Sequence, residues 1–502
     1  AAPVDDPALA APVTLTEHPA SPFVYSLGGD PVVNPGQSSF NSPAVGDVTG
    51  DGRPEIVAGG IGSDARVYTL DGTLLAVLDP GDVDPATRGA IQASAALGDL
   101  DGDGIDDVVI NSLGNRVAAY SLAGGTVHEL YNRYAAPAFE NAGHGMFATP
   151  AIGYLDYNEQ LDVVTASWGQ TVDVWSGPTG EPVPQLRQWV KDTIWSSPAI
   201  GDVDGDGTAE IVVGGDCEGA GAVGQPCSGI GQGGYVWAFN LDGSVQWSHF
   251  VNDAVVWSSP ALIDLNGDAA LDVVVGTGIY FDRPGARRVL ALDGRTGALL
   301  WEGATPGRVM GSPAVADVGG DAWVWAVSEG GTLTAWNSTG QQQWQACIAD
   351  QPCNSTLATF GGVAIADIND DGRLDAVVQG ETQLRVLDAL TGQQQAVART
   401  RHPQPVFASY GTPTVVEIDG TTHIVSVILA NSGGDYSIDA SDDMLVAFWT
   451  TGTGLGDAPW PTFQQNMART SNRVEVTPPH AGPPDLGDPS SSSACFDVAG
   501  ER

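Results

Sequence analysis

Basic residues are scarce in this sequence. Its 502 residues include one lysine, Lys191, and 19 basic residues in all, against 61 acidic ones, so the net charge is −42. Because nucleic-acid binding needs basic groups that neutralise phosphates, we expect no nucleic-acid partner. The same charge opposes docking on anionic lipid. No run of about 18 apolar residues is present, so we also expect no membrane insertion.

Catalytic signatures are missing as well. The sequence contains no Gly-x-Ser-x-Gly, no His-Glu-x-x-His and no glycine-rich phosphate loop with a lysine. Carboxylate pairs that could hydrolyse glycosides are plentiful, but most of them belong to a repeated loop that we assign to metal below. The sequence therefore favours a binding protein over an enzyme.

Cysteines are few, and four of the five form two close pairs. Cys217 and Cys227 bracket a glycine-rich stretch, Cys347 and Cys353 bracket a shorter one, and Cys495 is left over. Neither pair has the two-residue spacing of a zinc ribbon, so we expect a disulfide within each pair and an oxidising compartment. The first residues, without a basic or apolar leader, read as a mature end left after removal of a secretory signal. We therefore expect a secreted protein.

One motif recurs about every 50 residues. Residues 42–52, SPAVGDVTGDG, return as residues 197–207, SPAIGDVDGDG. The acidic loops of the other copies begin at Asp99, Asp264 and Asp367, with weaker copies at Tyr154, Asp317 and Glu417. This spacing predicts eight structural units between about residues 40 and 450.

Each unit has the pattern of four short strands. In the fourth unit these are residues 198–200, 210–213 and 235–239 and a strand that carries Trp247, with period-two alternation and no helical stripe. Eight such units predict an all-β fold, an eight-bladed β-propeller of four-stranded antiparallel blades. An open solenoid is the alternative, but no capping unit is visible.

The two ends differ from the repeats. Residues 1–25 form an N-terminal extension, and Phe23–Leu27 resembles a strand that would complete the last blade and close the ring. Residues 26–473 make up the expected propeller. Residues 474–502 are rich in proline and serine, which indicates a linker or a disordered tail.

Five copies place oxygen-bearing side chains at loop positions one, three, five and nine. Calcium takes about six to eight oxygen ligands, and alternate residues of a tight loop can point at one centre, with a backbone carbonyl at position seven. Magnesium prefers fewer protein ligands and more water. We therefore expect about five Ca²⁺ sites. The predicted ligands are Asp47, Thr49, Asp51, Arg53 and Glu55; Asp99, Asp101, Asp103, Ile105 and Asp107; Asp202, Asp204, Asp206, Thr208 and Glu210; Asp264, Asn266, Asp268, Ala270 and Asp272; and Asp367, Asn369, Asp371, Arg373 and Asp375.

The three weaker copies have lost part of this set. Tyr154 replaces the first ligand, the copy at Asp317 lacks the closing acid, and Glu417 and Asp419 stand alone. We expect these blades to fold without metal.

The intact pattern, Pro-Ala-x-Gly-Asp-x-Asp-Gly-Asp-Gly followed by a closing acid and an apolar strand, resembles the FG-GAP (VCBS-type) repeat. That family includes integrin α-subunit propellers and many secreted bacterial propellers. The resemblance implies a propeller with calcium in its loops, acting as an adhesin, a lectin-like binder or a polysaccharide lyase. Residues 291–297 are similar to quinoprotein propeller repeats, and residues 460–470 to a segment found beside such repeats. The adjacent cysteine pair typical of quinoprotein dehydrogenases is missing.

The topology of a propeller assigns these features to two faces. Connections between strands one and two, where the calcium loops lie, share one face with connections between strands three and four. Both cysteine pairs fall in connections of the opposite face. Long loops on a rigid scaffold often carry binding sites, so we expect the binding surface there.

A second periodic position marks the central channel on that opposite face. It lies seven residues before each acidic loop, where the innermost strand begins. The eight residues are Phe40, Gln92, Phe147, Trp195, Trp257, Met310, Phe360 and Tyr410. Two interpretations stay open, a hydrophobic plug of the channel or an aromatic-lined pocket for a sugar or another flat ligand. His144 and Arg308 would be polar residues of such a pocket.

The sequence thus predicts a secreted, calcium-stabilised propeller that serves as an extracellular binding or adhesion module for a glycan or a protein. The rival hypothesis is a calcium-dependent, lyase-like enzyme on acidic polysaccharide, with Tyr410, His144 or His402 as its base. A quinoprotein-like propeller is a third hypothesis.

Overall fold

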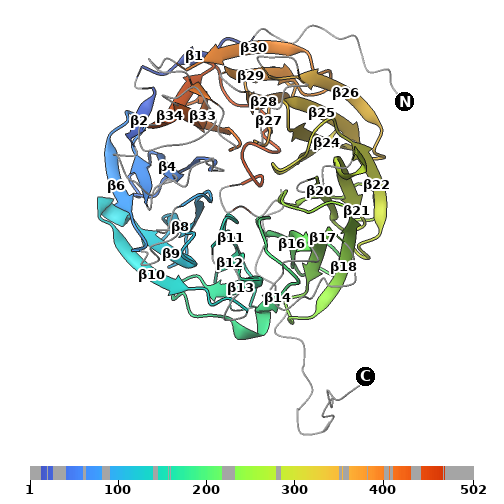
Figure 1. The fold of residues 1–502 in the computed structure, drawn as a ribbon. Coiled ribbons are helices and arrows are strands. Elements are labelled where there is room, and N and C mark those ends of the chain that lie inside the picture. The colour runs from blue at the N-terminus through green and yellow to red at the C-terminus, as the bar shows by residue number, and fades with distance from the viewer. Residues whose placement is uncertain are drawn as a thin grey trace, which may run out of the picture.

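The computed structural model confirms the predicted architecture, an all-β ring of eight antiparallel blades (Figure 1). The structure describes residues 13–19, 21–26, 41–59, 64–81, 91–138, 145–156, 158, 160–217, 232–278, 284–349, 353, 361–380, 383–400, 406–407, 411–430, 443–466 and 469. Phe40, His144, Cys227, Phe360, His402, Tyr410, Cys495 and the tail 474–502 lie outside these residues.

The first four blades follow the chain in order. Blade one consists of β3 (Ala44–Gly46), β4 (Glu55–Gly59), β5 (Ala65–Tyr68) and β6 (Leu74–Leu78). Blade two consists of β7 (Ala96–Gly98), β8 (Asp107–Asn111), β9 (Arg116–Ser121) and β10 (His128–Tyr134). Blade three consists of β11 (Ala151–Gly153), β12 (Asp162–Ala166), β13 (Thr171–Ser176) and β14 (Gln188–Trp189). Blade four consists of β15 (Ala199–Gly201), β16 (Glu210–Cys217), β17 (Gly233–Phe239) and β18 (Val245–Asn252).

The other four blades continue around the ring. Blade five consists of β19 (Ala261–Ile263), β20 (Asp272–Gly276), β21 (Arg288–Leu292) and β22 (Leu299–Ala304). Blade six consists of β23 (Ala314–Val318), β24 (Asp321–Ser328), β25 (Thr332–Asn337) and β26 (Gln342–Cys347). Blade seven consists of β27 (Ala364–Ala366), β28 (Asp375–Gln379), β29 (Gln383–Asp388) and β30 (Gln394–Arg399). Blade eight contains β32 (Thr414–Ile418), β33 (Thr421–Ala430) and β34 (Asp443–Thr450), and β31 (Val406–Phe407) pairs with β33.

The N-terminus supplies the outer strands of blade eight. Both β1 (Thr16–Glu17) and β2 (Phe23–Ser26) pair antiparallel with β34, with Thr16 opposite Thr450 and Phe23 opposite Val446. Figure 1 shows these blue strands beside the red strands of the last blade. The two ends of the propeller therefore meet within one sheet, so the ring is closed by hydrogen bonds.

The core lies between neighbouring blades. Val57 and Val67 of blade one, for example, belong to the same buried cluster as Leu97 and Val108 of blade two. The second strands of blades one to five and seven are buried along their whole length, whereas outer strands such as β18 alternate between buried and exposed residues. This is why valine-rich runs and period-two patterns occur together in each repeat.

Three outer-strand tryptophans fasten blades four to seven together. The indole N–H groups of Trp247, Trp301 and Trp344 donate to the carbonyls of Gly294, Ser338 and Ala389, each in the next blade, at 2.6, 2.9 and 3.0 Å. A glycine of that next blade faces each indole: Gly297, Gly340 and Gly392.

Helical structure is minor in the described residues, where it comprises three short 3-10 turns, η1 (Ala123–Gly125), η2 (Pro184–Leu186) and η3 (Pro284–Ala286). None of the described helices has the length or the apolarity that crossing a membrane requires.

Candidate metal loops and channel mouth

The five intact acidic loops lie in blades one, two, four, five and seven, and we name each metal loop after its blade. In loop one, Asp47 accepts hydrogen bonds from the backbone N–H groups of Gly50 and Gly52 at 2.7 and 2.8 Å. The first aspartate of each other loop accepts the equivalent bond from position six, at 2.7 to 3.0 Å. Position six has a positive φ in all five, including Ala269 at 69°, which explains the frequent glycine there.

Two loops bring three carboxylates together. One oxygen each of Asp99, Asp101 and Asp107 lies within 4.8 Å of the others in loop two. The carboxylates of Asp202, Asp204 and Asp206 converge in the same way in loop four. Loops one, five and seven carry a neutral side chain at position three, so their third oxygen would come from a hydroxyl or an amide. These residues are Thr49, Asn266 and Asn369.

The residues at position seven complete each turn. The backbone N–H donates to the carboxylate at position five in every loop, at 2.8 to 3.0 Å. These residues are Arg53, Ile105, Thr208, Ala270 and Arg373. Their side-chain types differ widely, as expected where a loop uses only the backbone.

The closing acids at position nine are buried where the second strands begin. They are Glu55, Asp107, Glu210, Asp272 and Asp375, and none is more than 2% exposed. In each, one oxygen accepts the backbone N–H of loop position two, at 2.9 to 3.3 Å. The closing acid therefore fastens the loop to the strand that follows it.

Burial makes the charge of these acids costly. It raises the pKa of Asp107 to about 7, of Glu210 to about 8, of Asp272 to about 6 and of Asp375 to about 7, and it also raises the pKa of Glu55. A divalent cation beside each carboxylate would offset this cost.

Two buried oxygen atoms of loops one and two lack a hydrogen-bond partner. Oδ1 of Asp107 is buried with no donor in hydrogen-bonding geometry, and so is Oγ1 of Thr49. Such atoms are rare in native proteins and often mark the place of an ion or a water. The all-oxygen donor sets, the converging carboxylates and these two atoms fit a hard cation such as Ca²⁺.

The three weaker loops differ in structure. Loop three keeps a buried closing acid, Asp162, whose pKa burial raises to about 7. In blades six and eight the loop is reduced to two-residue turns, Gly319–Gly320 and Asp419–Gly420, between directly paired strands. These turns leave no room for the five-ligand loop.

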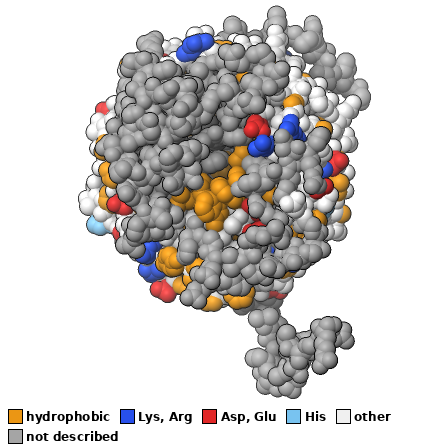
Figure 2. Space-filling view, viewed as in Figure 1, with side chains coloured by type: hydrophobic (Ala, Val, Ile, Leu, Met, Phe, Trp, Pro, Cys, Tyr) orange, Lys and Arg blue, Asp and Glu red, His pale blue; other side chains and the backbone are white. Residues whose placement is uncertain are grey.

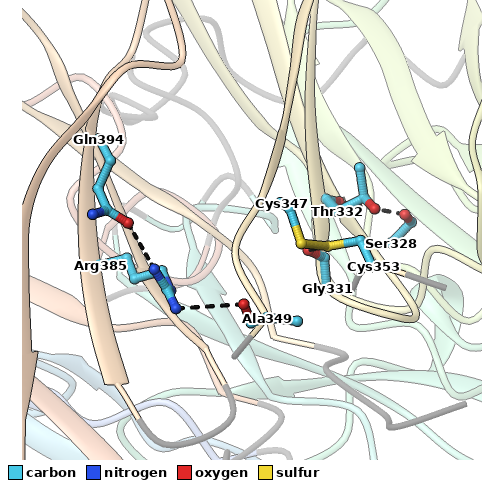
Figure 3. Close-up of a disulfide and its surroundings, with 8 residues drawn as sticks. All are labelled: Ser328, Gly331, Thr332, Cys347, Ala349, Cys353, Arg385 and Gln394. Carbon is cyan, nitrogen blue, oxygen red and sulfur yellow. Dashed lines mark hydrogen bonds between the residues drawn. A yellow bond between two sulfur atoms is a disulfide. The ribbon is translucent and has the colours of Figure 1, made fainter. Parts of the chain in front are cut away.

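A disulfide lies in the connection between blades six and seven, on the face opposite the metal loops. Cys347 at the end of β26 is bonded to Cys353, with 5.7 Å between the Cα atoms (Figure 3). Within the same connection the carbonyl of Ala349 accepts a hydrogen bond of 3.4 Å from Arg385 of blade seven. This stretch therefore links blades six and seven. Cys217 is buried at the end of β16, and its expected partner lies outside the described residues.

Aromatic residues of three successive blades meet at the channel mouth. Phe147 lies 4.5 Å from both Trp168 and Trp195, and Trp195 stacks on Trp257 at 3.8 Å with an interplanar angle of 13°. Phe147 is buried, whereas the three tryptophans stay partly exposed. We name these four residues the aromatic cluster. On the face shown in Figure 2, hydrophobic side chains gather near the centre.

Sequence reasoning missed two members of this region. Trp168 lies in the turn after β12, outside the periodic position, and Asp216 lies near the end of β16. The buried Asp216 carboxylate accepts the indole N–H of Trp257 at 2.7 Å and the hydroxyl of Thr193 at 2.9 Å. It thereby fixes the orientation of Trp257. No periodicity marks either residue.

The other predicted residues of this face differ in their burial and in their contacts. Gln92 is buried, Met310 is partly exposed, and Arg308 forms an ion pair with Glu329 at 3.2 Å. Phe40, Phe360, Tyr410 and His144 are among the residues that the structure does not describe.

The segment after the last blade enters the channel. Trp460 forms an antiparallel bridge with Ile365 of β27, through hydrogen bonds of 2.7 and 3.0 Å, and is only 2% exposed. Farther along, Gln464 donates to the carbonyl of Pro198 at 2.7 Å, at the start of the innermost strand of blade four. Residues 455–469 are named the plug segment.

Arg469 ends the described part of the plug segment. Its guanidinium is wholly buried and donates to the carbonyls of Ala95, Phe463 and Pro43, at 3.1, 2.8 and 3.4 Å. Burial lowers its pKa to about 9. The plug segment thus bonds to innermost strands on several sides of the ring, and Figure 1 shows it in the centre. These contacts join the plug segment to the entries of the innermost strands of blades one, two, four and seven.

Comparisons with known proteins agree with this geometry. The sequence model of the FG-GAP-like repeat matches residues 47–110, which include loops one and two. These residues carry FG-GAP-like repeats. A second model, described as outer membrane protein assembly factor BamB, matches residues 231–409, where the three fastening tryptophans lie. No curated protein sequence matches the chain significantly.

Solved structures share the fold at low identity. The biofilm matrix protein Bap1 of V. cholerae is 14% identical with a TM-score of 0.57, and the match covers 90% of this chain and 92% of that one. Sqt1 of Saccharomyces cerevisiae is 12% identical with a TM-score of 0.53, over 83% of this chain and 97% of that one. These likenesses show the propeller fold.

Proposed function

We propose that the chain is a secreted, calcium-stabilised propeller that serves as an extracellular binding or adhesion module. Calcium in the metal loops would stiffen one face, and the opposite face would present a glycan-binding surface. A rigid scaffold reduces the entropy that a binding surface loses when it engages its ligand. The biofilm matrix protein that shares this fold is in keeping with a role outside the cell.

The observation that carries the binding role is the partly exposed stack of Trp195 on Trp257. Aromatic faces are favourable surfaces for the apolar faces of sugars and for other flat ligands. The buried carboxylate of Asp216 holds Trp257 in place, so the surface is formed before a ligand arrives. Its position on the face opposite the metal loops leaves it clear of the calcium ligands.

Calcium would act here by charge and coordination. Carboxylates of loops two and four already converge, and the closing acids of all five loops are buried. Ca²⁺ bound there would neutralise part of a large negative charge and hold the start of each second strand. Extracellular calcium modules bind at about 10⁻⁴ to 10⁻³ M, which suits calcium-rich surroundings.

A glycan array with matched tryptophan variants tests the binding role. The wild type in calcium should bind a defined set of glycans, and the Trp195→Ala/Trp257→Ala variant should lose about tenfold or more in affinity. Trp189→Ala is the control, because Trp189 is 71% exposed on the outer strand β14 and belongs to no cluster. Equal binding by all three proteins, or no glycan bound by the wild type, would contradict the glycan surface.

A protein ligand is the second candidate. Residues 231–409 match a family whose name is that of an assembly factor, which favours a protein partner. The same variants distinguish the two ligands. If the ligand is a protein that binds this face, the Trp195→Ala/Trp257→Ala variant should bind it more weakly than the wild type does, and the wild type should bind no glycan on the array.

A further inference from the structure

Arg295 bridges two metal loops on neighbouring blades. It lies in the turn between β21 and β22, on the metal-loop face of blade five. One nitrogen of its guanidinium donates to the carbonyl of Asp204 in loop four. The other two donate to Asp268 of loop five, Nε to the carboxylate at 3.3 Å and Nη2 to the carbonyl at 3.2 Å.

Local backbone geometry makes room for this bridge. A Cβ at Gly205, the fourth position of loop four, would meet the guanidinium of Arg295 directly. The turn that carries Arg295 is itself fixed to blade five, because Gly294 N–H donates to the closing acid Asp272 at 3.0 Å. The guanidinium is therefore held between the two loops by its own blade.

Blade two shows the same contact without an arginine. There the backbone N–H of Gly124, in the turn between β9 and β10, donates to the carbonyl of Thr49 in loop one at 3.0 Å. Both contacts run from the turn of one blade to position three of the preceding loop. Of these two contacts, the one in blade five also brings a positive charge to predicted calcium ligands, Asp268 of loop five and Asp204 of loop four.

Loop five also has fewer carboxylates than loop four. Its side-chain ligands are Asp264, Asn266, Asp268 and Asp272, with three carboxylates, the same number as in loops one and seven, whereas loops two and four have four. Arg295 cancels a further charge and engages Oδ2 of Asp268, while Oδ1 accepts the N–H of Ala270 at 2.9 Å. Because calcium affinity rises with the number of charged ligands, loop five should be a poorer calcium site than loop four.

We propose that Arg295 is a positioning residue that takes the place of metal charge at loop five, so that loop five is ordered without calcium and binds it most weakly. The inference rests on the proposed calcium sites. The Arg295 side chain is 41% exposed, and solvent weakens its ion pair with Asp268. We therefore expect Arg295 to lower the calcium affinity of loop five by about three- to tenfold.

Calcium titrations by calorimetry and native mass spectrometry test the proposal. Removing the guanidinium in Arg295→Gln should raise the affinity of the weakest site about three- to tenfold. The gain should vanish when Asp268→Asn is added, because that change removes a ligand of loop five. Arg288→Gln is the control for charge, since Arg288 pairs with Glu302 on the outer strand of the same blade.

The outcomes separate the inference from the proposed function. Calcium binding by the wild type with no change in Arg295→Gln, or a weaker site in that variant, would overturn the inference alone. A gain that persists with Asp268→Asn would place the effect at another loop and would also overturn it. A wild type that binds no calcium would overturn the proposed calcium role and this inference with it.

Discussion

At the scale of single residues, the closing acids make the case for metal. A carboxylate buried to within 2% exposure, with its pKa raised by burial, costs stability unless a cation lies beside it. Asp107 shows this most clearly, because it lies among the converging carboxylates of loop two and one of its oxygens lacks a donor.

Asp107→Asn should therefore act in opposite ways with and without calcium. In EDTA the variant should be as stable as the wild type or more stable, since it removes a buried charge. In about 10 mM calcium it should lose about 1.4 to 2.7 kcal/mol of the stabilisation that a site with Kd near 10⁻⁴ to 10⁻³ M supplies. Urea unfolding in both buffers measures this. The exposed Glu129→Gln serves as control. If calcium stabilised Asp107→Asn as much as it stabilises the wild type, Asp107 would not be a calcium ligand.

The fastening tryptophans explain why particular glycines occur in the repeats. Gly297 has φ at 67°, and a Cβ there would lie 2.5 Å from the indole of Trp247. Gly297→Ala should destabilise by about 2 to 4 kcal/mol, the sum of backbone strain and overpacking. Gly125→Ala is the matched control, because Gly125 has φ at 76° and open space around it, so only about 1 kcal/mol of strain remains. Equal losses in the two variants would show that the indole contact contributes nothing.

At the scale of elements, the repeat was predictable and the plug segment was not. Alternating valines, the Asp/Gly loops and their spacing are local signals, so they locate the eight blades and the innermost strands. The pairing of Trp460 with Ile365 and the bonds of Arg469 to Ala95 and Pro43 join residues far apart in sequence. No local pattern specifies such contacts. The same reason hid Trp168, Asp216 and Arg295, whose roles depend on neighbouring blades.

The plug segment should contribute to the stability of the whole ring. Trp460→Ala leaves a cavity beside β27 and should cost about 3 to 5 kcal/mol in the free energy of unfolding. Trp189→Ala, on an exposed outer strand, should stay within about 0.5 kcal/mol of the wild type. Chemical denaturation of both variants gives the comparison. If Trp460→Ala were as stable as Trp189→Ala, the plug segment would be an attachment rather than a part of the core.

At the scale of the whole molecule, repulsion between negative charges opposes the compact fold. A net charge of −42 repels itself, and 17 of the 61 acidic residues are predicted ligands in the five metal loops of one face. Five Ca²⁺ ions would add ten positive charges and bring the net charge to −32. The fold places these loops at the same connection of five blades, so Ca²⁺ bound there would stabilise blades one, two, four, five and seven in the same way.

Native mass spectrometry of the full chain across a calcium titration measures how many metal loops bind calcium. We expect five bound Ca²⁺ per chain at saturation, four of them bound before the fifth, with thermal stability rising as the loops fill. A chain that binds no calcium, or whose stability does not change when calcium binds, would contradict this expectation.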